Sequence, residues 1–185
     1  MSSTEHPPSS TLSLAQQRAS LWADARQHVY ALLLASRLPG VRERLAQGEV
    51  DDWDGLWTGE LDAEERAAAP LLVSLKPQSA FTDWLLCEAA AGFGAWGALA
   101  QSRLPFLAMR MHGRELCKAQ MPNGQAIRID WMDPELMEAL LPVAAPDQLQ
   151  RAYAGFDVLV TLGTDRWTRW SLAGARLERQ TSAVA

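Results

Sequence analysis

The expected fold of this chain rests on the stretch Ile127-Arg128-Ile129-Asp130-Trp131-Met132-Asp133-Pro134-Glu135-Leu136, which joins an alternating segment directly to a proline-started one. Side chains of a strand point alternately to its two faces. The stretch therefore predicts a strand over residues 126–131 that buries Ile127, Ile129 and Trp131 and directs Arg128, Asp130 and Met132 to a polar face. Asp133 is a favoured N-cap residue and Pro134 a favoured first residue, so a helix is expected from there to Leu141.

The flanking sequence extends this pattern. Upstream, Pro122-Asn123-Gly124-Gln125 predicts a hairpin between strands 116–121 and 126–131, because Asn-Gly adopts positive φ at little cost. Other apolar runs predict strands at 29–34, 71–75, 95–100, 157–162 and 167–172, and the run at 29–34 is apolar on both alternating faces, so we expect that strand to be covered on two sides. A capping box at Ser13-Leu14-Ala15-Gln16, other caps and apolar stripes predict helices at 13–27, 41–47, 79–91, 104–116 and 146–154. Strands that alternate with helices indicate an α/β (α+β) fold, with a mixed and at least partly parallel central sheet flanked by helices.

The length of 185 residues suits one domain with a sizeable core. We expect that domain to span residues 12–175. Residues 1–11 are polar, contain Pro7-Pro8 and are expected to form a disordered tail, and residues 176–185 are expected to fray.

Composition excludes several classes of protein. A net charge of −5 argues against a nucleic-acid binder, which needs a basic surface. The acidic run at 43–65 is interpreted as a solvated loop. The chain has neither a secretion signal at its start nor an apolar run long enough for a membrane span, so we expect a cytoplasmic protein. Cys87 and Cys117 lie among apolar neighbours and are interpreted as small core residues, not as zinc ligands or a disulfide.

The nearest approach to a catalytic set is Ser102, His112, Arg114 and Asp133. A serine nucleophile needs a sharp exposed turn such as Gly-x-Ser-x-Gly, which is absent. Ser102 is better interpreted as a helix cap before Leu104, and His112 as a structural residue at the rim of the core. Gly92-x-Gly94 with Gly97 precedes a strand, whereas a phosphate loop precedes a helix. We therefore expect no enzyme activity, no metal, no cofactor and no small-molecule substrate.

Two groups of residues are candidates for binding a protein partner. On an ideal helix, the side chains of Arg103, Arg110, Arg114 and Lys118 project within roughly 80° of one another. This basic stripe is either the solvent edge of a mostly buried helix or a surface for an acidic partner. The second group is Trp167 and Trp170, which alternate with Arg166 and Arg169. Few residues remain to cover both faces of that strand, so either at least one indole is exposed as an anchor or both pack inward.

Several segments together resemble one known family. They are Tyr30-Ala31-Leu32-Leu33 before Leu38-Pro39-Gly40, Ala69 to Val73, Trp96-Gly97 through Ser102, His112 with Arg114, Pro122-Asn123-Gly124, Arg128 through Asp133-Pro134, and Leu140-Leu141-Pro142 before Gln148-Leu149. In this order and spacing, the chain resembles the family called domain of unknown function 4123. The resemblance covers about Tyr30 to Val160. The chain departs from it at Gly113, where the family favours leucine, and at Ile129 and Trp131.

The resemblance implies a function. Members of that family are associated with type VI secretion, where they act as chaperones or adaptors that load effectors onto the secretion spike. The implied partner is a cognate effector, with a VgrG or PAAR spike protein as a second candidate. Trp96, Gly97, His112, Arg128, Asp133 and Pro134 are its motif positions, and we expect Arg128 and Asp133 to serve the scaffold. Two alternatives stay open, namely a self-contained enzyme and an immunity-type or regulatory module that inhibits a toxin.

Overall fold

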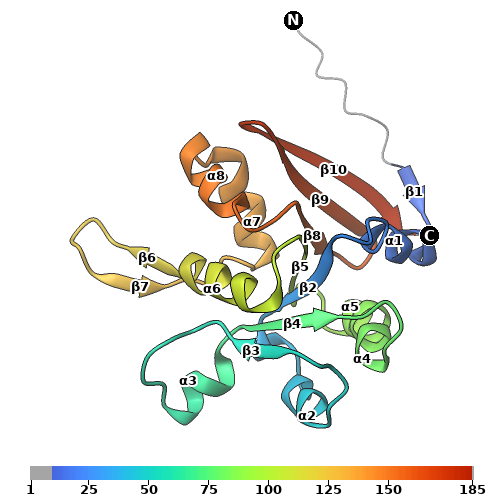
Figure 1. Cartoon of the computed structure of the whole chain (residues 1–185), viewed down its shortest axis with the longest axis horizontal. Coiled ribbons are helices and arrows are strands. Elements are labelled where there is room, and N and C mark those ends of the chain that lie inside the picture. Colours follow the sequence, from blue (N-terminus) through green and yellow to red (C-terminus); the bar gives the residue numbers. More distant parts are fainter. Residues whose placement is uncertain (1–9, 185) are drawn as a thin grey trace, which may run out of the picture.

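A computed structural model describes residues 10–184 and contains one large central sheet (Figure 1). Its strand order is β1-β10-β9-β8-β5-β2-β4-β3. The strands are β1 (Ser10–Leu12), β2 (His28–Leu33), β3 (Trp53–Gly55), β4 (Leu71–Leu75), β5 (Gly97–Ser102), β8 (Val158–Leu162), β9 (Arg166–Ala173) and β10 (Arg176–Val184). A separate hairpin pairs β6 (Lys118–Gln120) with β7 (Ala126–Arg128).

The sheet is mixed, which confirms the predicted α+β class, but its parallel pair lies in an unexpected place. Only β1 and β10 pair in parallel, and every other neighbour is antiparallel. β4 and β5 do run in the same direction, and the helical segment between them provides the crossover that two such strands need. They are not neighbours, however, because β2 lies between them and is antiparallel to both.

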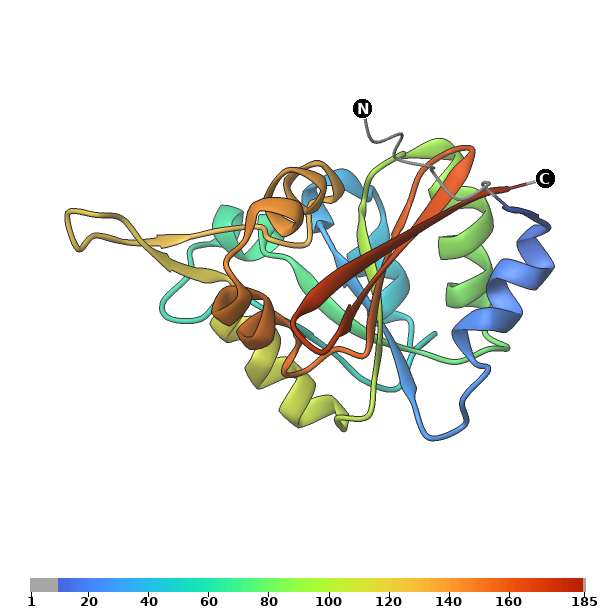
Figure 2. The same ribbon diagram turned by 90° about the horizontal axis from the view of Figure 1, so that it is seen from above.

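The helices cover both faces of this sheet. They are α1 (Leu14–Leu21), α2 (Val41–Ala46), α3 (Ala63–Ala68), α4 (Ala80–Asp83), α5 (Ala90–Gly92), α6 (Phe106–Leu116), α7 (Pro134–Leu140) and α8 (Pro146–Tyr153). A π-helical turn, Trp84–Ala89, joins α4 to α5, and short 3₁₀ turns lie at Ala35–Arg37 and Leu141–Val143. Figure 2 shows the sheet between the two groups of helices.

Two hydrophobic cores follow from the alternation along the central strands. Val29, Ala31 and Leu33 of β2 pack on one face with residues of α1, α2 and α4. Tyr30 and Leu32 of β2 pack on the other face with residues of α6, α7 and α8. Because β2 is buried on both faces, it has the continuous apolar sequence that predicted a strand covered on two sides.

Local signals in the sequence place most of the element ends correctly. Ser13 and Gln16 form the predicted capping box of α1. Asp133 caps α7 by accepting the Glu135 N–H at 3.0 Å, and Pro134 is its first residue, as predicted. The hairpin turns at Asn123-Gly124 with φ of 83° at the glycine. These interactions span only a few residues, so the sequence pattern alone was sufficient to predict them.

The two predicted tails include strand residues. Residues 176–184, expected to fray, form the nine-residue strand β10, which pairs with β9 along its length. Ser10 and Thr11, assigned to a disordered tail, belong to β1, and the rest of that tail lies outside the described residues. The main-chain ladder with β9 explains why β10 is ordered although its sequence is mostly polar.

Three side chains lie in environments other than those predicted. Cys87 is exposed, because the helical segment 80–92 turns Phe81, Leu85 and Ala89 to the core instead. Met132, expected on a polar face, is fully buried. Strand β7 ends at Arg128, after which the chain turns, with the Asp133 N–H donating to the Asp130 carbonyl at 2.9 Å. This turn breaks the alternation on which the prediction relied.

The Trp96-Gly97 pair sits where β5 meets β2 in the middle of the sheet. Trp96 is buried, and its carbonyl accepts the Leu34 N–H at 2.8 Å. Gly97 has φ of 146°, and a Cβ atom there would lie 2.0 Å from the Leu32 carbonyl oxygen. Only glycine fits, because the obstacle is main chain that cannot move aside.

We predict that Gly97→Ala lowers the free energy of unfolding by more than about 3 kcal/mol, since it adds both a steric clash and a strained φ. Urea unfolding followed by circular dichroism measures this. Gly92→Ala is the matched control, because a Cβ there meets nothing within 4 Å and φ is not positive. If the two variants unfolded at the same urea concentration, the close approach at Gly97 would not constrain the fold.

Candidate functional site

The C-terminal tryptophans are core residues. Trp167 and Trp170 are only 2% and 1% exposed, so of the two alternatives it is the inward packing of both indoles that the structure shows. Strand β9 lies between β8 and β10, and its two indoles pack into opposite cores. The alternative of an exposed indole rested on treating residues 176–185 as frayed, whereas β10 pairs with β9 along this strand.

The two arginines beside these tryptophans differ in environment. Arg166 is exposed next to Asp165. Arg169 is partly buried and donates to the Gln101 side chain and, at 3.2 Å, to Ser20 Oγ. Burial lowers the pKa of Arg169. Its contacts are therefore with the protein's own scaffold, and we do not retain this group as the docking surface.

The basic stripe is largely used to hold the edge of the sheet. Arg110 and Arg114 of α6 both reach Asp54 of β3, at 2.6 and 3.1 Å. Arg114 also donates to the Gly55 carbonyl through Nε at 3.1 Å and Nη2 at 2.9 Å. Part of the acidic run is thus paired within the protein and is not a solvated loop.

The remaining members of the stripe lie on separate elements. Arg103 precedes α6 and lies 3.8 Å from Asp157, whereas Lys118 begins β6 and pairs with Glu115 at 2.6 Å.

Helix α6 itself buries only Met109 and Gly113, and Leu107 and Met111 are exposed. The expectation of a mostly buried helix is therefore wrong.

The side chains considered for catalysis form hydrogen bonds or ion pairs with other parts of the fold. His112 Nε2 donates to the Ala152 carbonyl at 2.8 Å, and its ring packs edge-on against Phe156. Ser102 Oγ donates to the Gly155 carbonyl at 2.6 Å and accepts the Leu104 N–H. Asp133 pairs with Arg37 in addition to capping α7. Among the described residues, no hydrogen bond links Ser102, His112 and Asp133.

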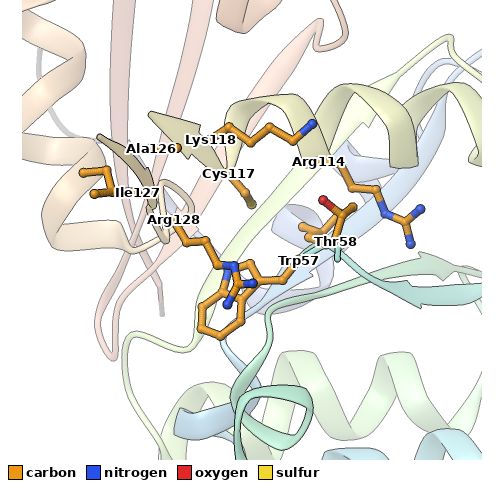
Figure 3. A pocket seen from close by; sticks show the side chains of 9 residues that line it. Trp57, Thr58, Arg114, Cys117, Lys118, Ala126, Ile127 and Arg128 are labelled. Carbon is orange, nitrogen blue, oxygen red and sulfur yellow. The ribbon is translucent and has the colours of Figure 1, made fainter. Parts of the chain in front are cut away.

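A cavity of about 580 Å³ opens between α6, the hairpin strand β7 and the loop that follows β3 (Figure 3). Leu56, Trp57 and Thr58 come from the loop, Arg114 and Cys117 from the end of α6, and Lys118, Ala126, Ile127 and Arg128 from the hairpin. Three of these side chains are cationic and none is acidic. Each cation is paired with a carboxylate of the protein: Arg114 with Asp54, Lys118 with Glu115 and Arg128 with Glu65. A partner group that is anionic and partly apolar would therefore bind here by exchanging with one of these carboxylates.

Arg128 is the residue that connects the walls of this cavity. Figure 3 shows it over the ring of Trp57, with 5.4 Å from the guanidinium carbon to the ring centroid. It also pairs with Glu65 of α3 at 2.7 Å, so it joins β7 to the loop and to α3. Both side chains of this ion pair are more than a third exposed, and the pair is therefore open to exchange with a carboxylate from outside.

The departure from the family pattern at Gly113 has a structural explanation. A Cβ atom at Gly113 would lie 3.0 Å from Leu56 Cδ2, so glycine lets Leu56 pack closely on α6. Leu56 is fully buried, and its N–H donates to the Pro70 carbonyl at 2.8 Å. The cavity wall that begins at Leu56 thus depends on the missing side chain at 113. Sequence reasoning missed this wall, because Trp57 lies in a polar segment without a periodic pattern.

Two ionisable groups lie next to the cavity. Burial raises the pKa of the Asp130 carboxyl, an effect that the nearby Trp57 indole N–H partly opposes. Burial also raises the pKa of the Cys117 thiol to about 12, so this cysteine is a neutral thiol at physiological pH and a poor nucleophile. Within residues 10–184 no cluster of three or more His, Cys, Asp or Glu side chains is arranged to hold a metal ion.

A second cavity, of about 550 Å³, lies between α7 and the ends of β8 and β9. Its charged lining residues are Glu135, Glu138 and Arg166, of which Glu138 already pairs with Arg179 at 2.8 Å. Its charges are therefore of both signs, and we regard the first cavity as the candidate site.

Comparison with known proteins adds one finding. The family described as "Domain of unknown function (DUF4123)" matches residues 29–151, which is more than half of the chain. The chain belongs to the DUF4123 family. No curated protein and no solved structure matches it. All the residues that line the candidate cavity fall inside the matched DUF4123 range, whereas β8, β9 and β10 lie beyond it. In the part of this DUF4123 protein that the structure describes, no helix is both long and apolar enough to cross a bilayer.

We predict that Asp130→Asn stabilises this DUF4123 domain increasingly as the pH rises from about 4 to 7. The pKa of Asp130 is higher in the folded than in the unfolded chain, so its contribution favours folding below the ordinary value of 3.8 and is lost as the pH rises through the folded value. Urea unfolding of both proteins across this range measures the difference. Glu60→Gln, which removes an exposed carboxylate, controls for net charge. A difference that shrinks with rising pH would contradict the assignment.

Proposed function

We propose that this DUF4123 protein is a non-enzymatic chaperone or adaptor, which binds a specific type VI secretion effector in the cytoplasm and promotes its loading onto a VgrG or PAAR spike protein. Family membership supports the pathway. The observation that carries the binding role is the cavity beside Arg128, whose walls are apolar and cationic and carry no acidic side chain.

The chemistry of the site favours binding over catalysis. Ser102 Oγ and His112 Nε2 each donate to a main-chain carbonyl of the scaffold, and the Cys117 thiol is buried with a raised pKa. A nucleophile and a base within hydrogen-bond reach of each other are the usual requirement for covalent catalysis. Recognition of a protein instead requires apolar contact area with charges that set orientation, which the walls of the cavity supply.

We predict that the tagged protein, expressed in its native host, recovers one specific secreted effector, and that deletion of its gene abolishes secretion of that effector. Mass spectrometry of the recovered material and of culture supernatants measures both. Arg128→Glu should reduce recovery about tenfold or more, because it reverses a charge at the centre of the site. Arg151→Glu on α8 is the control, since Arg151 is exposed and does not line the cavity.

Two outcomes would reject the proposal. One is the recovery of no secretion component together with unchanged secretion in the deletion strain. The other is a recovered toxin whose activity is blocked by the purified protein and whose secretion does not depend on it. The second result would identify an immunity-type module, because such a module inhibits its partner and does not escort it.

A further inference from the structure

The hairpin strand β7 has a free hydrogen-bonding edge. The Ile129 N–H donates to the Cys117 carbonyl at 3.0 Å, and the Met121 N–H donates to the Gln125 carbonyl at 2.8 Å. Hydrogen-bonded pairs alternate along an antiparallel ladder, so the peptide groups of Ala126 and Arg128 point away from β6. Nothing within residues 10–184 hydrogen-bonds to these outward groups.

This edge borders the candidate cavity. Ala126, Ile127 and Arg128 all line it, and Arg128 joins β7 to Glu65 of α3 across it. In Figure 1, β7 is the strand of the hairpin that faces α3. A chain that paired with β7 would therefore run along the cavity, with alternate side chains directed at its walls.

The other strand edge on this side of the molecule is already blocked. β3 is the edge strand of the large sheet, and its Gly55 carbonyl accepts two N–H groups from Arg114. Bonding of this kind blocks pairing with another strand. In the described part of the chain, the edge of β7 beside the cavity is not blocked in this way and can accept a strand.

The charges of the hairpin indicate what kind of strand it accepts. Lys118 and Arg128 are directly opposite in the β6–β7 register, so their side chains lie on the same face. Like charges in opposite positions destabilise a hairpin. Glu115 and Glu65 each neutralise one of them, but both carboxylates are at least 40% exposed. A carboxylate on a strand paired with β7 would lie next to Arg128 on the same face, and Lys118 would lie on the far side of Arg128, on β6.

The hairpin is also a small two-stranded sheet to which a third strand could add. Each strand has three residues, and the hairpin projects from the body of the molecule in both views (Figures 1 and 2). An isolated pair of strands is only marginally stable, and a third strand adds both main-chain bonds and a face for side-chain contacts.

We propose that an extended acidic segment of the partner adds to β7 as a third strand, directing carboxylates to the face of Arg128 and Lys118 and apolar side chains to the opposite face, that of Ile127. That the partner is a secretion effector rests on the function proposed above. The chemistry of the segment, alternating acidic and apolar residues, rests on the hairpin alone.

Fluorescence anisotropy with a labelled probe peptide tests this proposal. The probe is about seven residues long and alternates valine with acidic residues. In a strand, this alternation places the acidic side chains on one face and the valines on the other. We expect saturable binding of this probe. A matched peptide with asparagine and glutamine in place of the acids should bind about tenfold more weakly or less, since it loses the charge-assisted bonds.

N-methylation tests the strand pairing itself. Two versions of the probe carry methyl groups on alternate peptide nitrogens. Only every second N–H of an added strand faces β7, so one version should lose binding and the other should retain it. Equal binding of the two versions would overturn strand addition, and equal binding of the acidic and amide probes would overturn the charge recognition.

Substitutions in the protein separate recognition from folding. Arg128→Gln and Lys118→Gln should each weaken probe binding several-fold. Glu65→Gln should tighten it, because it frees Arg128, and glutamine can still serve in the capping box that Glu65 forms with Asp62. A misfolded variant cannot produce tighter binding. Arg151→Gln is the control and should bind as the unmodified protein does, and weaker binding by Glu65→Gln would contradict the proposal.

The two proposals fail in different ways. If the effector is recovered equally by the unmodified protein and by the Lys118→Gln/Arg128→Gln double variant, the β7 edge is not its docking site and the adaptor function stands. If no secretion component is recovered, the adaptor function fails, and the probe measurements still decide whether β7 accepts an acidic strand.

Discussion

The close approach of β5 to β2 at Gly97 is the constraint on which the rest of the structure depends. The Leu32 carbonyl would lie 2.0 Å from any Cβ at this position, and the neighbouring Trp96 carbonyl accepts the Leu34 N–H. This contact sets the register of the two strands at the centre of the eight-stranded sheet. Because β5 leads into α6, the same register also sets where α6 begins and which side chains it presents to the edge strand β3.

Helix α6 connects the core to the candidate site. Its buried side carries Met109 and Gly113, and its arginines hold Asp54 and Gly55 of β3. These ion pairs are roughly a quarter to a third exposed, so their individual contribution to stability is modest. Their main effect is geometric, since they bring the loop that contains Trp57 against the end of the helix. The cavity exists because two segments far apart in the sequence meet at this helix.

The proposed binding role follows from where the fold leaves polar groups without partners. The peptide groups in the sheet interior are paired, and the β3 edge is closed by Arg114. Within the described residues, the hairpin combines outward peptide groups, two cations in opposite positions and an adjoining apolar wall. A docking site on such an edge obtains its affinity from the main chain and its specificity from alternate side chains. An adaptor that must choose one cargo among many proteins needs both.

The sequence by itself determined the features that depend on near neighbours. The cap at Asp133-Pro134, the capping box at Ser13, the Asn123-Gly124 turn and the doubly buried strand at 29–34 were all predictable, because each is defined by contacts or alternation within a few residues. Family membership was likewise predictable from the order of its motifs, and the matched range of 29–151 confirms it.

Only the tertiary structure decided which distant segments pair. Strand β10 is polar and weak by itself, yet it orders against β9, and that pairing buries Trp167 and Trp170. Arg110 reaches Asp54 across 56 positions of the chain, and Arg128 reaches Glu65 across 63. Such contacts leave no periodic trace in the sequence, because their energy depends on the folded positions of the two partners and not on the spacing between them.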